Sequence, residues 1–378
     1  MTPTAAAGGS RREGPSGGAS AVAIAVLLAG AALRIAFLGS LRENYDLVSF
    51  RMAAEVVRRG GALYREVVRY NYSPVWAYVV AGLDWARGAF GVSLARAITS
   101  LLLLADVATA AVLYRIARGR GASAARAGGA AALFFANPVS VVVSSLRGMF
   151  DAISILFLIL SIHLMERKPA RKAGAVAAMS ASVLVKHVTW FHPLLLARRG
   201  SPRLRLAAAL VPYAVFFASF LPFWSSRERV LAQVFRYQGL SEPYGVDALR
   251  RLAWIPTWGL PALCAAAALL AAFWLARRGV ELGRASLLLF LVLLVFLPGI
   301  TPYYFVWPIA LGALDPSAGF AVYTAVVTLF LIHSPDAIGV ELSHLPGWSG
   351  PWWAAVLWLL WEIRALTRRR PEASPAAA

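Results

Sequence analysis

The run AVAIAVLLAGAALRIAFLG (residues 21–39) decides the fold class, because it is apolar over a length that can cross a bilayer. About 20 consecutive apolar residues are enough for a helix to span the hydrocarbon core. The run is longer than the apolar centre of a signal peptide, and no convincing cleavage pattern accompanies it. We therefore expect it to remain as the first membrane span, preceded by a disordered tail at residues 1–20.

The composition extends this prediction to the whole chain. Its 378 residues are 60% hydrophobic and only 15% charged, which is rare for a soluble domain of this size. Several later apolar runs are too short to cross alone, so we expect hairpins that enter and return around a buried cavity. The sequence predicts an all-α, polytopic membrane protein with about 10 to 13 transmembrane or re-entrant helices. The expected apolar segments are 21–39, 92–117, 127–143, 151–165, 173–184, 190–197, 206–223, 258–276, 285–297, 303–313, 319–331 and 353–366.

One further helix, residues 74–90, differs from these runs. It begins with Pro74, and proline is common at the first helical position. It also carries Asp84, Trp85 and Arg87. A helix of this composition is more typical of the membrane interface than of the hydrocarbon core, so we expect it to lie along the membrane surface.

The formal charge of +19 is explained by short basic clusters between the apolar runs. Such clusters favour the cytoplasmic side of a membrane, which places both termini there. The expected location is a bacterial plasma membrane. We expect one integral-membrane domain at 21–366 and a second disordered tail at 367–378. The first outer loop, residues 42–72, contradicts this charge rule, which expects few basic residues on the outer side, since the loop holds six arginines. Nucleic acid is not an expected partner because no groove-reading motif is present. The single cysteine, Cys264, excludes an intramolecular disulfide and a thiolate metal cluster.

The first candidate site residues lie in this outer loop. A carboxylate such as Asp46 at the end of a span costs desolvation energy unless it is paired or functional. A salt bridge to Arg42 or Arg51, within a turn or two of helix, is the structural alternative. Tyr70 and Tyr72 follow in RYNYSP, and an interfacial aromatic belt is the alternative for both.

A second group lies in NPVSVVVSSLRGMFD (137–151), where Arg147 at an outer turn can bind a phosphate. Asp151 opens the next helix, and N-capping would explain it by itself. Lys186, in SVLVKHVTWFHP (182–193), lies in an apolar hairpin and requires a counter-charge or an anionic ligand. Snorkelling to the interface is the alternative.

Two histidines follow Lys186 within this motif, and later segments add cations and aromatic rings. His187 and His192 raise a metal hypothesis, but no acidic residue lies nearby at ligand spacing. The later segments offer side chains of the kind that sugars and phosphates contact: Arg236, Tyr237, Tyr244, Tyr303 and Tyr304.

Taken in this order, the motifs resemble the integral-membrane glycosyltransferases of the GT-C superfamily. The resemblance is to polyprenyl- or dolichyl-phosphate-mannose-dependent mannosyltransferases, namely the enzymes that add the first mannose of GPI anchors and their bacterial polyprenol-phosphate-mannose relatives. In that group an acidic outer loop precedes G-x-x-x-Y and Y-x-Y-x-P, and later motifs are N-P…S-S-R-G-N-x-[ED], a lysine-bearing short helix and Q-Y-F-V-W. Here Asp46 takes the place of the acid, Gly60 and Tyr64 match G-x-x-x-Y, and Tyr70, Tyr72 and Pro74 match Y-x-Y-x-P. The later motifs are matched by residues 137–151, Lys186 and residues 303–307.

The resemblance implies an inverting transferase that uses no nucleotide sugar. Its polyprenyl-phosphate donor would supply a hexose, mannose by resemblance, to a lipid- or glycan-linked acceptor at the outer membrane face. Asp46 would be the catalytic base. The remaining implied site residues bind substrate: Arg147, Asp151, Lys186, His187, Arg236, Tyr303, Tyr304, Tyr70 and Tyr72.

The chain departs from the family pattern in three places. Asp46 has no adjacent acid, since Glu43 lies three residues earlier; one residue is inserted before Arg147; and Met149 replaces an Asn or Gln. No cofactor is expected, and the metal requirement stays open because no acidic cluster is present.

A polytopic lipid or sugar transporter, or a flippase, is the main alternative, because it also needs spans and a cavity. The absence of a clear internal repeat and the loading of polar groups onto one face argue against it. An oligosaccharide ligase would need a large outer loop, and a phosphoethanolamine-type transferase would need a soluble metal-bearing domain.

Overall fold

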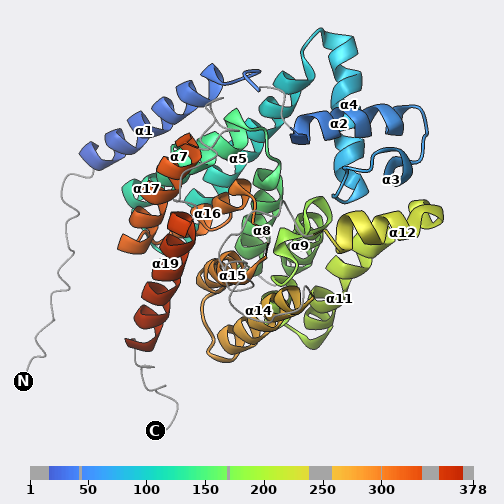
Figure 1. Ribbon diagram of the computed structural model, residues 1–378. Coiled ribbons are helices and arrows are strands. Elements are labelled where there is room, and N and C mark those ends of the chain that lie inside the picture. The colour runs from blue at the N-terminus through green and yellow to red at the C-terminus, as the bar shows by residue number, and fades with distance from the viewer. Residues whose placement is uncertain are drawn as a thin grey trace, which may run out of the picture.

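The computed structural model describes residues 17–41, 45–167, 171–237, 258–298, 300–333 and 349–368. These residues form helices and connecting turns, with no strand among them, which confirms the all-α prediction. Figure 1 shows α2, α3 and α4 gathered at one corner of the molecule, beside a larger group of helices that includes α8, α9 and α15. Tyr244 and the two predicted tails at 1–20 and 367–378 lie wholly or mostly outside the described residues.

The helices fall into long and short classes. The long α-helices are α1 (Gly17–Ala36), α2 (Tyr45–Arg58), α4 (Pro74–Phe90), α5 (Leu94–Gly119), α6 (Ala124–Phe135), α8 (Asp151–Met165), α9 (Lys172–Val185), α11 (Pro202–Ala218), α14 (Gly259–Arg277), α15 (Leu282–Phe296), α17 (Ala318–His333) and α19 (Ser349–Arg368). The short or irregular ones are α3 (Leu63–Glu66), α7 (Pro138–Ser140), η1 (Val141–Leu146), η3 (His187–Thr189), α10 (Pro193–Leu196), η4 (Leu221–Ser226), α12 (Arg227–Val230), η5 (Leu231–Phe235), η6 (Pro302–Val306) and α16 (Ile309–Gly312).

Three of the described helices are long and apolar enough to cross a membrane: Gly18–Ala36, Leu94–Gly119 and Gly259–Arg277. Two bent pairs raise this number to five if each pair is one span. Ala124–Phe135 and Pro138–Leu146 meet at 41°, and Pro202–Ala218 and Leu221–Phe235 meet at 56°. Further apolar helices, α8, α9, α15 and α17, are shorter. These helices are compatible with a membrane protein.

The core of the described structure lies around α15 and α8. Almost every residue of α15 is buried, including Leu291 and Leu294. A helix that is apolar on all sides is expected to be enclosed by other elements. α14 and α19 pack against α15, and α5 and α9 pack against α8. The polar start of α8 at Asp151 is therefore held inside a packed helical group.

The helix predicted at residues 74–90 is α4, with the same bounds. Trp76, Val80 and neighbouring residues are buried on one face. On the same helix Trp85 is 69% exposed and Phe90 is 77% exposed. Gly91 ends the helix at φ +67°, a left-handed conformation in which glycine avoids the steric cost of a Cβ.

A buried arginine, which the sequence analysis did not single out, connects α1 to four other elements. Arg34 is fully buried, and its Nη1 lies 2.6 Å from Asp106 Oδ2 on α5. The same guanidinium donates to the carbonyl of Phe135 at 3.0 Å and to the hydroxyls of Ser140 at 2.7 Å and Ser145 at 3.1 Å. These bonds hold the break between α6 and η1, directly before the turn that leads to Asp151.

We expect Arg34→Met to destabilise the protein by about 3–5 kcal/mol, because it leaves the Asp106 carboxylate buried without its charge partner. Replacing both residues, as Arg34→Met with Asp106→Leu, should recover most of that loss. Thermal unfolding of the purified protein in detergent measures both variants. As a control, Arg120→Gln removes partly exposed ion pairs to Glu166 and Glu281 and should cost at most about 1 kcal/mol. Equal effects of the Arg34 and Arg120 changes would contradict the assigned role.

Candidate functional site

Asp46 lies in the first turn of α2 and is bound by the loop that precedes α4. The hydroxyl of Tyr72 donates to Asp46 Oδ1 at 2.8 Å. Two further hydrogen bonds hold the backbone of this loop. The Tyr64 hydroxyl donates to the Tyr72 carbonyl at 2.9 Å, and the Tyr70 hydroxyl donates to the Ser73 carbonyl at 2.7 Å. The spacing of tyrosines in this loop thus has a structural purpose, which is to hold the Tyr72 side chain against Asp46.

The surroundings of Asp46 favour its protonated form more than water does. Burial raises the pKa of the Asp46 carboxyl above its usual value, while the bond from Tyr72 and the charge of Lys186 act in the opposite direction. Asp151 adds a smaller effect that raises this pKa, and Arg69 one that lowers it. A carboxylate with a raised pKa accepts a proton more readily near neutral pH than an ordinary aspartate does.

Lys186 and Asp151 form a buried ion pair. The lysine follows the last residue of α9 with extended backbone, and its Nζ lies 2.5 Å from Asp151 Oδ2, at the start of α8. The side chains are 5% and 0% exposed. The other carboxylate oxygen, Oδ1, accepts the indole N–H of Trp307 at 2.7 Å.

These contacts overturn two alternatives from the sequence. Lys186 does not snorkel, since it is buried and paired. Asp151 does not act as a helix cap: Phe150 occupies the N-cap position, and both oxygens of Asp151 accept bonds from distant side chains.

Tyr72 joins the two halves of the site. Its hydroxyl is bonded to Asp46, and its ring centroid lies 5.5 Å from Lys186 Nζ. The rings of Phe150 and Tyr304 lie 4.9 Å and 5.6 Å from the same nitrogen. The ammonium group is thus enclosed by aromatic faces, which attract a cation. The structure thereby brings together Asp46, Tyr72, Asp151, Lys186 and Tyr304, which come from five separate segments.

An apolar cavity of about 240 Å³ lies beside this cluster. Tyr304 of the cluster and Trp307, which donates to Asp151, are both part of the cavity wall, and their stacked ring centroids lie 4.4 Å apart. The lining side chains are mostly aromatic or aliphatic: His187, Val188, Trp190, Phe191, Tyr237, Leu293, Leu297, Pro298, Tyr304 and Trp307. A sugar ring or an isoprenoid segment fits walls of this chemistry.

The other predicted site residues occupy different places. Arg147 is 2% exposed, donates to the Leu331 carbonyl at 3.3 Å and lies 5.2 Å from the ring of Tyr303. Tyr70 is fully buried and supports the loop. Arg236 is exposed at the end of η5, whereas Tyr237 after it lines the cavity.

Two contributors were not selected from the sequence. Trp307 and Phe150 lie inside motifs that were noticed, but neither was assigned a role there. A buried indole N–H needs a hydrogen-bond acceptor. This requirement is the feature of the sequence that could have pointed to Trp307. Nothing in the local sequence marks Phe150, because its position over Lys186 arises from the packing of α8 against α9.

His192 is fully buried, and its ring centroid lies 4.5 Å from that of Phe290. Within the described part of the chain, no group of three or more His, Cys, Asp or Glu side chains is placed to hold a metal ion.

The comparisons with known proteins add no identification. No protein-family model matches the chain, and no solved structure gives a significant match.

We expect Lys186→Met to destabilise the protein by about 3–5 kcal/mol, because Asp151 would remain as a buried charge without a cation. The matched control is the double variant Lys186→Met with Asp151→Asn, which removes both charges and should recover much of the loss. Thermal midpoints of the purified variants give the comparison. If the double variant is no more stable than the single one, the two side chains do not form a mutually dependent pair.

Proposed function

We propose that the chain is a membrane-embedded glycosyltransferase of GT-C type that moves a hexose, mannose by resemblance, from a polyprenyl-phosphate donor to a lipid- or glycan-linked acceptor. The observation that carries this proposal is the arrangement of Asp46, Tyr72 and Lys186 beside an aromatic cavity. The arrangement supplies a carboxylate base and a fixed cation within one small region. Transfer of a sugar from a lipid phosphate needs these two groups.

Asp46 activates the acceptor in this proposal. The acceptor hydroxyl is a weak nucleophile until its proton is removed in the transition state. Asp46 takes that proton while the acceptor oxygen forms a bond to the anomeric carbon. The bond from Tyr72 leaves one carboxylate oxygen, Oδ2, for the acceptor and fixes the orientation of the group.

Lys186 assists the leaving group. The bond between the anomeric carbon and the phosphate oxygen breaks, and its electron pair stays on the phosphate. A cation already held in position stabilises this developing charge without further reorganisation. The ammonium group has more donors than the one Asp151 accepts, so it can contact a phosphate while Asp151 keeps it in place.

The cavity suits the donor. Its walls are apolar along Leu293 and Leu297 and carry polar ring edges at Tyr304 and His187. An isoprenoid would contact the first kind of surface and a sugar hydroxyl the second. In this arrangement the lipid phosphate lies between the cavity and Lys186, with its sugar directed toward Asp46. The outer face of a bacterial plasma membrane is the proposed location.

We expect Asp46→Asn to retain donor binding while transfer falls by about 100- to 10,000-fold, because asparagine keeps the shape of the side chain but cannot accept a proton. The measurement is transfer of radiolabelled sugar from polyprenyl phosphate to acceptor lipids, with donor affinity determined in the same membranes. Asp46→Glu should recover little activity, since a displacement of about 1 Å can itself cost 100-fold.

The matched control is Glu228→Gln, which neutralises an exposed carboxylate on α12 and should leave transfer unchanged. Near-normal transfer by Asp46→Asn would exclude Asp46 as the base. If the wild-type protein moves labelled lipid across the bilayer without transferring sugar, the chain is a transporter instead.

The pH profile provides an independent test of the base. The bond from Tyr72 lowers the pKa of Asp46, so its removal in Tyr72→Phe should raise this pKa further. Since only the ionised carboxylate accepts a proton, the acidic limb of kcat/KM should move to higher pH in the variant. Activity at alkaline pH should fall less than activity at acidic pH. An acidic limb at the same pH in both proteins would mean that another group limits the reaction.

A further inference from the structure

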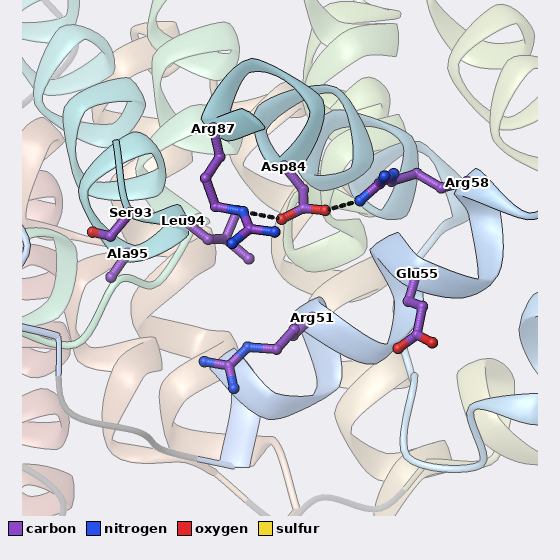
Figure 2. A pocket seen from close by; sticks show the side chains of 8 residues that line it. All are labelled: Arg51, Glu55, Arg58, Asp84, Arg87, Ser93, Leu94 and Ala95. Carbon is purple, nitrogen blue, oxygen red and sulfur yellow. Dashed lines mark hydrogen bonds and ion pairs between the residues drawn. The ribbon is translucent and has the colours of Figure 1, made fainter. Parts of the chain in front are cut away.

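A second pocket, of about 540 Å³, lies between α2, α4 and the start of α5. Its lining differs from that of the aromatic cavity, because most of its side chains are charged. The residues are Arg51, Glu55, Arg58, Asp84, Arg87, Ser93, Leu94 and Ala95, and Figure 2 shows how they are placed. None of them belongs to the proposed catalytic cluster.

The pocket has an excess of positive charge. Asp84 is only 12% exposed and is held from both sides, with Arg58 Nη1 at 2.5 Å and Arg87 Nε at 2.8 Å (Figure 2). Both arginines are 52% exposed, so their outer faces remain open to the pocket. Among the lining side chains, three guanidinium groups outnumber two carboxylates.

The start of α5 adds backbone donors to the same pocket. Ser93 is the N-cap of this long helix, and Leu94 and Ala95 are in its first turn. The N–H groups of a first turn have no intrahelical acceptor, and the helix dipole adds partial positive charge there. Arginine side chains together with a helix N-terminus are a favourable environment for a phosphate.

The arginine content of the first outer loop points to the same pocket. Two of the six arginines that contradict the charge rule, Arg51 and Arg58, line this pocket.

The aromatic side chains of α4 indicate where this pocket lies relative to a bilayer. Trp85 and Phe90 are exposed, and they flank Arg87 on the same helix. Exposed aromatic rings next to arginine are typical of the headgroup level of a membrane. A phosphodiester with one negative charge is found at that level in an anionic phospholipid.

We propose that this pocket binds the headgroup phosphate of an anionic phospholipid. The phosphate lies against Arg51, Arg87 and the first turn of α5, and the acyl chains extend past the aromatic residues of α4. Because α2 carries both Arg51 and Asp46, a bound headgroup holds the catalytic carboxylate at a fixed level of the membrane. This last consequence rests on the proposed function, whereas the lipid site does not.

The test is a titration of the purified full-length protein with phosphatidylglycerol and with phosphatidylcholine, followed by native mass spectrometry. The wild-type protein should bind phosphatidylglycerol at least about tenfold more tightly, since choline adds a positive charge that the arginines repel. Arg51→Gln should weaken phosphatidylglycerol binding about tenfold, which corresponds to the loss of one charge-assisted contact. Arg51→Gln with Arg87→Gln should abolish the preference.

Arg59→Gln is the matched control, because Arg59 is an exposed arginine at the end of the same helix but does not line the pocket. Its binding should stay within about twofold of wild type. Arg51→Gln leaves both partners of Asp84 in place, so it tests the site even if the double variant fails to fold. Equal losses in Arg51→Gln and Arg59→Gln, or no loss in Arg51→Gln, would overturn the proposal.

A second arm of the experiment distinguishes a lipid from a soluble phosphate. Glycerol 3-phosphate, added as a competitor at the concentration of the lipid, should not displace phosphatidylglycerol, because it lacks the acyl chains. Displacement at equal concentration would overturn the assignment to a lipid headgroup. None of these measurements requires sugar transfer, so the lipid site can fail while the proposed function stands, and the reverse also holds.

Discussion

The buried pair of Lys186 and Asp151 is the interaction on which the candidate site depends. An ammonium group with 5% exposure needs a counter-charge, and Asp151 supplies it at 2.5 Å. The pair joins the end of α9 to the start of α8, and Trp307 binds the same carboxylate from η6. Two packed helices and a later segment are therefore brought to one point. The cavity begins there because Trp307 is also part of its wall.

A second buried ion pair also connects separate helices. Arg34 and Asp106 connect α1 to α5, and the remaining donors of Arg34 bind the irregular segment between α6 and η1. The chain must then turn at Gly148, where φ is +67° and a Cβ would lie 2.8 Å from Leu41. A glycine at this position permits the turn that directs Asp151 toward Lys186. The Arg34–Asp106 pair thus stabilises the segment before the turn at Gly148, and the Lys186–Asp151 pair stabilises the start of α8 after it.

The two halves of the site differ in how firmly they are held. Lys186 and Asp151 lie within the packed helices, whereas Asp46 lies on α2, at the corner formed by α2, α3 and α4 (Figure 1). Hydrogen bonds from Tyr64, Tyr70 and Tyr72 hold the connecting loop, and Tyr72 reaches both halves.

The sequence by itself determined the helical class, the apolar segments and the bounds of α4, because these depend on composition, hydrophobic length and a proline start. It also singled out Asp46, Asp151 and Lys186, since charged residues beside apolar runs are costly unless they are paired or functional. Only the tertiary structure decided which charges pair. Lys186 and Asp151 are 35 residues apart in the chain, and Arg34 and Asp106 are 72 apart, so no local pattern relates them. The structure also separated Tyr70, which supports a loop, from Tyr72, which contacts Asp46, although both occur in one short motif. Hydrogen bonds to distant backbone and side-chain atoms, rather than local spacing, set these different roles.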